Sequence, residues 1–515
     1  MKTKVKNKKI LANVLILIAM LVMTSIFAGN VKAAVSDNDV AKIGEQGYAT
    51  LAEAVGAASN EETTITLLKD VNEDVVIPSG KNIKLDLGTY NLTDSGAHKD
   101  TIYVQKGANL TIVGNGTITN NYTGYAPLFN NGTVVMEGVT LKRDTTKFLY
   151  TNSKGEDIYN NWYVICNHGT MTINSGTVSV NGNKSSLVDN GYSNFTSTNE
   201  RAGYVVGINQ EKPKLTINGG TFDGGMNTIK NDDNATLTIN NGTFKNNYQV
   251  AVMNWNIATI NGGTFETPTG NDKTNLFVGN YGADSVDKGI LVINGGTFNA
   301  EHLLEGYTGV VTPVEINGGT FNYTKSFLNE GKEYIHSSLI DVNGVNITGE
   351  ITAPVSALKY AKTGAVVTIT DSVNVGDKLE IADGVKVVLP NTESDKVVVE
   401  NPDGSYTIEY KDADYTKVEE AIKKVESLNA GDYKDFSKVE AAVKAVVLGK
   451  NITEQETVNG YATAIEEAIN GLEKKAVNNE ETDNPKTSDN ILMSIAIGLV
   501  GVISIAGIVI YKKQK

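Results

Sequence analysis

A six-residue motif, Ile-Asn-Gly-Gly-Thr-Phe, recurs along the chain and constrains the fold more than any other sequence feature. This repeat motif begins at residues 217, 260, 293 and 316, and a variant with Asn in place of the first Gly begins at residue 239. Looser copies begin at residues 112 and 173. The shortest steps between copies are about 22 residues, a length typical of one coil of a parallel β-solenoid.

Each copy of the repeat motif alternates apolar and polar residues before a glycine turn. In Leu215-Thr216-Ile217 the apolar side chains face one way and the threonine faces the other. Glycine, and asparagine less readily, adopts the positive φ that a sharp corner needs. Stacked coils are therefore expected to form ladders of isoleucine, of asparagine and of phenylalanine. The phenylalanine ladder would contain Phe222, Phe244, Phe265, Phe298 and Phe321.

The first coil of such a solenoid needs a cover, because an uncapped edge invites aggregation. Residues 50–58 are expected to form a short amphipathic helix that supplies it, with Thr50 as the N-cap. Apolar residues recur in this stretch at helical spacing. They are Leu51, Ala54, Val55 and Ala58.

Two stretches outside the repeat motif share one layout of strands and turns. Residues 65–87 and residues 367–389 both read as strand, turn, short strand, glycine and strand. The strands from Thr64–Leu68 to Leu87 also resemble the start of secreted bacterial β-helix proteins of the pectate-lyase-like superfamily, which implies a right-handed parallel β-helix. We therefore predict an all-β domain over residues 34–392, a parallel β-helix of about 22 residues per coil. A closing hairpin is expected over residues 393–410.

At Asp412 the hydrophobic period changes from two to helical, and residues 411–475 are predicted to form a small all-α three-helix bundle. Thr453 is expected to cap the third helix. Several short runs are distinctive: Asp414-Tyr415, Leu428-Asn429, Tyr433-Lys434-Asp435-Phe436-Ser437 and Ala464-Ile465-Glu466-Glu467-Ala468-Ile469. With these runs the segment closely resembles the FIVAR module of bacterial surface proteins. The resemblance implies a spacer or weak binding module without catalytic residues.

Both ends of the chain carry targeting features. Residues 1–33 combine a lysine-rich start, an apolar stretch and the small-residue end Val31-Lys32-Ala33, a pattern typical of a cleaved signal peptide. Residues 491–510 carry no charge and are numerous enough to span a bilayer as a single transmembrane helix. The basic residues within 511–515 are expected to remain in the cytoplasm.

The linker over residues 476–490 contains Asn484-Pro485-Lys486-Thr487-Ser488 just before the apolar stretch. The order of pentapeptide, apolar helix and basic tail resembles the sorting signal of Gram-positive surface proteins that sortases attach to the cell wall, whose pattern is Leu-Pro-x-Thr-Gly. Pro485 and Thr487 match, whereas Asn484 and Ser488 depart from the pattern and leave the sortase class open. The resemblance implies cleavage after Thr487 and its covalent link to peptidoglycan, so that only the precursor spans the membrane. The alternative is an ordinary tail-anchored membrane protein.

Charge and cysteine content exclude two further possibilities. The net charge of −14 becomes more negative when the lysine-rich ends are removed, so there is no basic field to attract nucleic acid. The single cysteine, Cys166, rules out an intramolecular disulfide framework and is interpreted as a small buried apolar residue. The histidines share no metal-ligand spacing, and neither a metal nor a cofactor is predicted. They are His98, His168, His302 and His336.

Two functions are compatible with this organisation. The first is a wall-anchored adhesin or structural stalk whose β-helix contacts a glycan or a host protein. The second is a polysaccharide lyase or glycoside hydrolase, which needs paired carboxylates or an acidic calcium site with a base. The strongest charged cluster is Lys230, Asp232 and Asp233, followed by Glu200-Arg201, and both are interpreted as solvated loop charge. The first function is therefore favoured, and no enzymatic activity is expected.

Long polar inserts interrupt the repeats at residues 145–161, 181–199 and 268–287. Such loops are the natural places for ligand contacts on a solenoid. Aromatic faces can stack on sugars, although packing over the coil below is the alternative role for each aromatic side chain. The aromatic residues expected to contact a ligand are Tyr159, Trp162, Tyr192 and Trp255.

Overall fold

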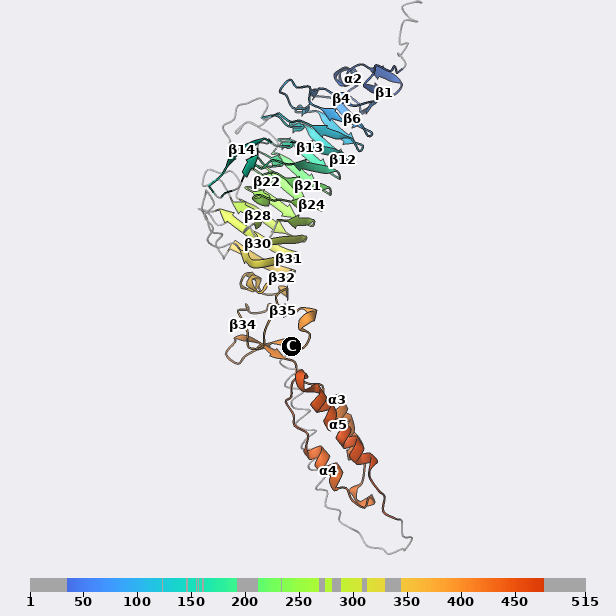
Figure 1. The fold of residues 1–515 in the computed structure, drawn as a ribbon, viewed down its shortest axis with the longest axis vertical. Helices are drawn as coiled ribbons and strands as arrows, with labels where there is room; N and C mark the ends of the chain where they lie inside the picture. The colour runs from blue at the N-terminus through green and yellow to red at the C-terminus, as the bar shows by residue number, and fades with distance from the viewer. Residues whose placement is uncertain are drawn as a thin grey trace, which may run out of the picture. The chain divides into compact units, whose positions relative to one another are not determined.

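The computed structural model divides into two compact units, residues up to Pro354 and residues from Val355, which are considered separately (Figure 1). The predicted signal peptide, the sorting pentapeptide and the predicted membrane helix lie outside the described residues. Within the described ranges, no helix has the length and apolar character needed to cross a membrane. The described residues are 35–122, 124–144, 147–153, 155, 157–159, 162–191, 212–232, 234–267, 274–279, 289–307, 313–328 and 344–476.

Unit 1 is an all-β stack of coils in which strands form three parallel ladders. The first ladder contains β3 (Thr63–Leu67), β6 (Asn82–Asp86), β9 (Asn109–Val113), β12 (Thr133–Glu137), β17 (Thr170–Ile173), β20 (Lys214–Ile217), β23 (Thr236–Ile239), β26 (Ile257–Ile260), β29 (Ile290–Ile293), and parts of β31 (Val314–Leu328) and β32 (Val345–Ala353). The second ladder contains β4 (Val71–Asn72), β7 (Leu92–Thr93), β10 (Thr117–Thr119), β13 (Thr140–Arg143), β18 (Thr177–Val180), β21 (Thr221–Gly224), β24 (Thr243–Lys245), β27 (Thr264–Glu266) and the first part of β30 (Thr297–Tyr307). The third ladder contains β5 (Val75–Ile77), β8 (Ile102–Val104), β11 (Leu128–Asn130), β16 (Ile165–Asn167), β19 (Val188–Asn190), β22 (Asn227–Asn231), β25 (Val250–Asn254), β28 (Thr274–Gly279) and the second part of β30. This parallel-dominated arrangement confirms the predicted all-β, solenoid-like fold.

The repeat motif forms the corner between the first and second ladders. In the copies that begin at residues 217, 239, 260 and 293, the isoleucine ends a strand of the first ladder and the phenylalanine lies in a strand of the second, whereas β31 runs through the whole copy at 316–321. Gly263 shows why glycine is required: its φ is +104°, and a Cβ atom there would lie 3.0 Å from the carbonyl oxygen of Gly242 on the preceding coil. A larger residue here would combine a strained backbone with a contact that neighbouring atoms must relieve by a few tenths of an ångström.

The phenylalanines of the repeat motif stack along the inside of unit 1, as the sequence predicts. Ring centroids lie 4.9, 4.8, 4.7 and 5.0 Å apart, and the ring planes are inclined by 15° at most. All of these side chains are fully buried, and each buried aromatic contributes about 1.5–3 kcal/mol through the area it removes from water. The stack contains Phe222, Phe244, Phe265, Phe298 and Phe321.

The asparagines of the repeat motif also stack, and their side chains form a separate row at the exposed corner between the first and second strand ladders. Each amide nitrogen donates to the side-chain oxygen of the asparagine on the preceding coil, at 2.7 to 2.9 Å. This pattern confirms the expected asparagine ladder. It runs from Asn174 through Asn218, Asn240, Asn261 and Asn294 to Asn317.

A short helix and a hairpin cover the first coil. Helix α2 (Leu51–Ala57) begins after Thr50, whose hydroxyl oxygen accepts a hydrogen bond from the backbone N–H of Glu53 at 3.1 Å. The predicted apolar stripe of this helix is buried. Strand β1 (Ala41–Ile43) pairs antiparallel with both β2 (Gln46–Tyr48) and β3, so the open edge of the first ladder is occupied.

Unit 2 opens with the 3₁₀ helix η3 (Val355–Tyr360) and one further coil-like pair of strands. Strands β33 (Val366–Ile369) and β35 (Lys386–Val388) pair in parallel, as β3 and β6 do, so the shared layout extends to the pairing. The 3₁₀ helix η4 (Asn391–Glu393) leads to the antiparallel hairpin of β36 (Lys396–Glu400) and β37 (Tyr406–Tyr410), which β34 (Lys378–Leu379) joins. The division between units falls at Pro354, whereas the predicted domain border lies at residue 392.

Three helices complete the described part of unit 2: α3 (Thr416–Glu426), α4 (Ser437–Lys444) and α5 (Gln455–Asn470). The 3₁₀ turns η5 (Ala430–Asp432) and η6 (Ile452–Glu454) precede α4 and α5. The expected cap at Thr453 is wrong, because the chain makes the extra turn η6 and Asn451 accepts from the backbone N–H of Thr453 at 3.0 Å. The apolar faces of the three helices share one core. Its buried residues include Val418, Ala421, Ile422, Val425, Val439, Val443, Val458, Ala462 and Ile465.

Replacing a central ring of the phenylalanine stack tests how much the stacking contributes. Phe265→Ala is expected to lower the free energy of unfolding by about 3–5 kcal/mol, because it removes a fully buried ring between two others. Urea denaturation followed by circular dichroism measures this change. The control is Val76→Ala, whose side chain is 44% exposed on β5, and its effect should stay within about 0.5 kcal/mol. Equal effects would contradict the stacking argument.

Candidate functional site

Chain length varies at two of the three corners of the coils, and both flank the third ladder. The corner between the first and second ladders stays short, as at residues 174–176 and 218–220. Long connections enter or leave the third ladder at residues 144–164, 191–213 and 280–289. Because ligand contacts on a solenoid concentrate where insertions occur, the third ladder is the candidate functional face.

The third ladder is buried on both faces over much of its length. Its strands β11, β16, β19, β25 and β28 are buried at every position, whereas strands of the other two ladders alternate. Side chains that point away from the core form one continuous line in register, which we name the outer row. Val76 begins this line at 44% exposed, but Phe129, Cys166 and Phe277 are at most 7% exposed. The outer row contains Val76, Tyr103, Phe129, Cys166, Asp189, Lys230, Met253 and Phe277.

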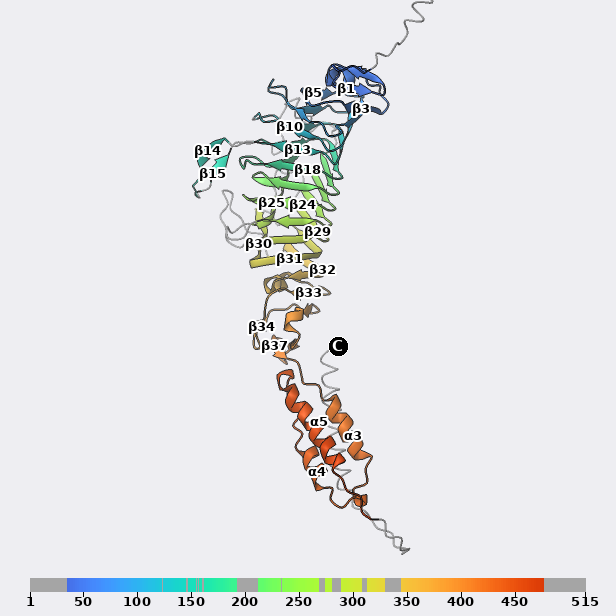
Figure 2. The ribbon, with the colours of Figure 1, turned by 45° about the vertical axis from the view of Figure 1, so that its right-hand side comes forward.

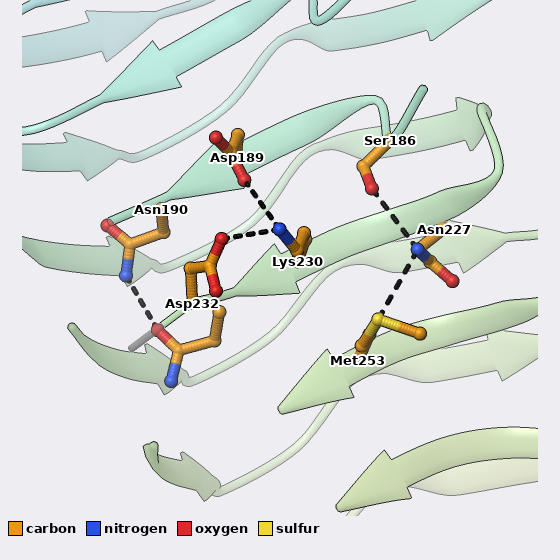
Figure 3. Close-up of polar contacts among 8 residues, drawn as sticks. Ser186, Asp189, Asn190, Asn227, Lys230, Asp232 and Met253 are labelled. Carbon is orange, nitrogen blue, oxygen red and sulfur yellow. Dashed lines mark hydrogen bonds and ion pairs between the residues drawn. The ribbon is translucent and has the colours of Figure 1, made fainter. Parts of the chain in front are cut away.

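Three charged residues lie together at the middle of the outer row, and two of them, Asp189 and Lys230, belong to it (Figure 3). The Nζ atom of Lys230 contacts Oδ2 of Asp232 on the same chain segment and lies 3.9 Å from Oδ1 of Asp189 on the neighbouring strand. The side chain of Asp232 is fully buried, and those of Lys230 and Asp189 are 14% and 10% exposed. The interpretation of Lys230 and Asp232 as solvated loop charge is therefore wrong. Asp233 and Glu200-Arg201 lie outside the described residues.

Burial dominates the electrostatics of this lysine–aspartate cluster, which comprises Asp189, Lys230 and Asp232. Loss of water raises the pKa of Asp189 to about 7, although the charge of Lys230 opposes the shift and that of Asp232 adds to it. Burial also opposes the charge of Lys230, but the two carboxylates together raise the pKa of this lysine. The charge of Asp189, followed by burial, raises the pKa of the nearby Tyr163 well above its ordinary value. Asp189 is thus a carboxyl group with an unusually stable protonated form.

A ladder of buried asparagines holds the outer row in register. Each amide nitrogen donates to the next side-chain oxygen at 2.7 to 2.8 Å, and each of these asparagines directly follows a residue of the outer row. Most also donate to a backbone carbonyl of the first ladder, as Asn190 does to Thr236 at 3.1 Å. All are fully buried, so the third corner is fixed by paired polar groups. They are Asn130, Asn167, Asn190, Asn231 and Asn254.

Sequence reasoning missed a hairpin that extends from the insert-bearing side. Strands β14 (Phe148–Thr151) and β15 (Asp157–Tyr159) pair antiparallel and stand out from the stacked strands in Figure 2. Asn152 donates to the hydroxyl of Tyr248 at 3.0 Å, which ties the hairpin to a distant coil. Phe148 and Tyr150 are 50% and 51% exposed, so the hairpin presents aromatic surface to solvent. No periodicity marks this hairpin in the sequence, because it lies between repeats.

The predicted ligand-contact residues fall into different environments. Tyr159 is half-buried on β15, with its ring 6.0 Å from that of Phe148, and Trp162 is half-buried against Tyr163 at 5.0 Å. Trp255 is only 9% exposed and packs on Phe277 at 4.8 Å between ring centroids. Its indole therefore lies among core side chains. Tyr192 lies outside the described residues.

Cys166 forms no disulfide, and its burial confirms its interpretation as a small buried apolar residue. It packs with Ala126 and Phe129. Among the described residues, no three His, Cys, Asp or Glu side chains gather in a way that would hold a metal ion. No protein-family model, curated protein or solved structure matches this chain.

The two tryptophans of the chain allow a direct test of these environments. Trp162→Phe leaves Trp255 as the sole indole, and its fluorescence should be blue-shifted and weakly quenched by iodide because the ring is buried. Trp255→Phe leaves Trp162, and the emission should be red-shifted and more strongly quenched. The same quenching in both variants would contradict the described packing.

Proposed function

We propose that this protein is exported, joined to the cell wall through Thr487 by a sortase, and displays unit 1 as an adhesin or structural stalk. The observation that carries the proposal is the order of pentapeptide, apolar stretch and basic tail at residues 484–515, combined with the signal-peptide pattern at residues 1–33. In this proposal unit 1 is a right-handed β-helix of the pectate-lyase-like kind. Residues 411–475 act as a FIVAR-like spacer between the β-helix and the wall.

The exposed aromatic surface of the β14–β15 hairpin supports a binding role on the insert-bearing side. Phe148 and Tyr150 are about half exposed, and Tyr159 contributes a neighbouring ring. Exposed aromatic side chains supply contact area at low conformational cost and are frequent anchors of binding sites. A glycan or a host protein surface is the class of ligand that this hairpin would bind.

The second function considered, cleavage of a glycan, lacks a favouring observation. A glycosidase needs two carboxyl groups on either side of a sugar bond. The two carboxyl groups of the lysine–aspartate cluster, Asp189 and Asp232, are buried around Lys230. Adhesion therefore remains the proposed function.

The anchoring step is tested by Thr487→Ala in the native cell. The variant should move from the wall fraction to the membrane or the medium, because the carbonyl that a sortase attacks belongs to a threonine in this pattern. Thr482→Ala changes the same residue type in the same linker and should leave wall retention unchanged. Unchanged retention of the Thr487 variant would refute wall anchoring.

The binding role is tested by screening the exported chain on a glycan array and measuring affinity for the strongest glycan. Tyr150→Ala should weaken binding about tenfold or more, equivalent to ~1.4 kcal/mol. Tyr90→Ala is the matched control, since this tyrosine is 37% exposed but lies at the insert-free corner between β6 and β7. Equal losses for both variants, or no bound glycan and no change in attachment to host cells, would reject the hairpin as the contact surface.

A further inference from the structure

The lysine–aspartate cluster has the composition of a site for bond formation between side chains. It combines the primary amine of Lys230 with the carboxyl group of Asp189 on the neighbouring strand and that of Asp232 on the same chain segment. Asp189 and Lys230 occupy directly opposed positions on the adjacent parallel strands β19 and β22. Figure 3 shows all three side chains pointing toward one another. The amine and the Asp189 carboxyl group are thus held as neighbours by backbone pairing.

The surroundings of the cluster are apolar along the outer row. Cys166 precedes Asp189 and Met253 follows Lys230 in register, and these flanking side chains are 3% and 8% exposed. Within the described part of the chain, Oδ1 of Asp189 accepts no hydrogen bond despite its burial, and its nearest cationic group is the Lys230 amine. A low local polarity favours the neutral carboxyl form of Asp189. The carboxyl groups beside Lys230 raise the pKa of its amine, so the ammonium form needs a proton acceptor before it can react.

An ion pair is a weak explanation for burying these three groups. Removing charged groups from water costs several kcal/mol per ion, and the attraction between them often fails to offset that cost. The raised pKa of Asp189 reflects this penalty. In contrast, a condensed amide carries no charge and suits an apolar row. Fixed proximity also gives intramolecular reactions effective concentrations of up to about 10⁵–10⁸ M.

We propose that Nζ of Lys230 forms an intramolecular amide bond with Cγ of Asp189, assisted by Asp232. Asp232, as a carboxylate, accepts one proton from the Lys230 ammonium group. The neutral amine then attacks Cγ of the protonated Asp189, so that a C–N bond forms and the C–OH bond breaks. Asp232 donates its proton to the departing hydroxyl group, which leaves as water, and accepts a second proton from the nitrogen. The amide keeps the third nitrogen proton and Asp232 ends protonated, so no oxidant or other reactant is needed.

The link would join two neighbouring coils across the longest break in the third ladder. Residues 191–213 separate β19 from β20 and interrupt the repeat at this coil. A covalent bond between residues 189 and 230 closes the chain around that connection and restricts the unfolded state, as a disulfide does. The only cysteine is Cys166, so an amide supplies a restraint that a disulfide cannot. This inference is independent of wall anchoring and of ligand binding.

Peptide mapping of the full exported chain tests the bond. Trypsin cleaves after lysine and arginine, so a linked chain should yield residues 185–201 joined to residues 215–245, with Lys230 uncleaved. The joined species should weigh one water molecule less than its two parts. Fragmentation should assign the bond to Asp189. Separate peptides of unmodified mass, or a link from Lys230 to Asp232, would overturn the assignment.

Matched variants separate condensation from ion pairing. Lys230→Arg keeps the positive charge but lacks an amine that condenses, and Asp189→Ala removes the acceptor, so both should lose the joined peptide and regain the missing water in the intact mass. Asp232→Asn should lower the linked fraction, and a fully linked Asp232 variant would overturn its role as proton acceptor. Lys245 and Glu266 provide the control, since they oppose each other on neighbouring strands at 3.4 Å but are nearly half exposed. Lys245→Arg should leave the Asp189–Lys230 link intact, and circular dichroism confirms that each variant is folded.

Discussion

The inner surface of each coil in unit 1 is apolar, and only the coils above and below can cover it. The phenylalanine stack shows this dependence directly, because both faces of Phe244 are covered by Phe222 and Phe265 from neighbouring coils. Backbone pairing in exact register is the condition for such stacking, since a slip of one residue would turn the inner side chains outward. The second glycine of each motif suits this close spacing, because its φ is positive and a Cβ atom there would meet a neighbouring atom closely, as at Gly263. Everything else in unit 1 depends on this vertical alignment.

Alignment also explains why a charged cluster can exist in an apolar row. The third ladder places residues of successive coils side by side on its outer face at a fixed spacing, whatever the chemistry of the side chain. Asp189 and Lys230 are adjacent because both directly precede asparagines of the buried ladder. The fold therefore brings together groups that are distant in sequence, and the asparagine ladder sets their distance.

The sequence predicts the parts of the fold that repeat and fails where repetition stops. The repeat motif predicts the phenylalanine and asparagine ladders, because identical residues at equal spacing stack in successive coils. It does not reveal that Asp189 faces Lys230, although aligning the chain on the buried asparagines Asn190 and Asn231 would have done so. The β14–β15 hairpin escaped prediction because its strands pair only with each other. Burial of Lys230 was also missed, since the covering of the outer row depends on tertiary packing and not on local pattern.

In unit 1 the glycine corner keeps a constant length, whereas the two corners beside the third ladder vary in length. Insertions that enter at the third ladder leave the glycine corner, and hence the spacing of every other coil, unchanged. The length of these connections can therefore change while the scaffold beneath keeps its dimensions. The corners that accept insertions and the corner that fixes the spacing of the coils are different parts of the same coil.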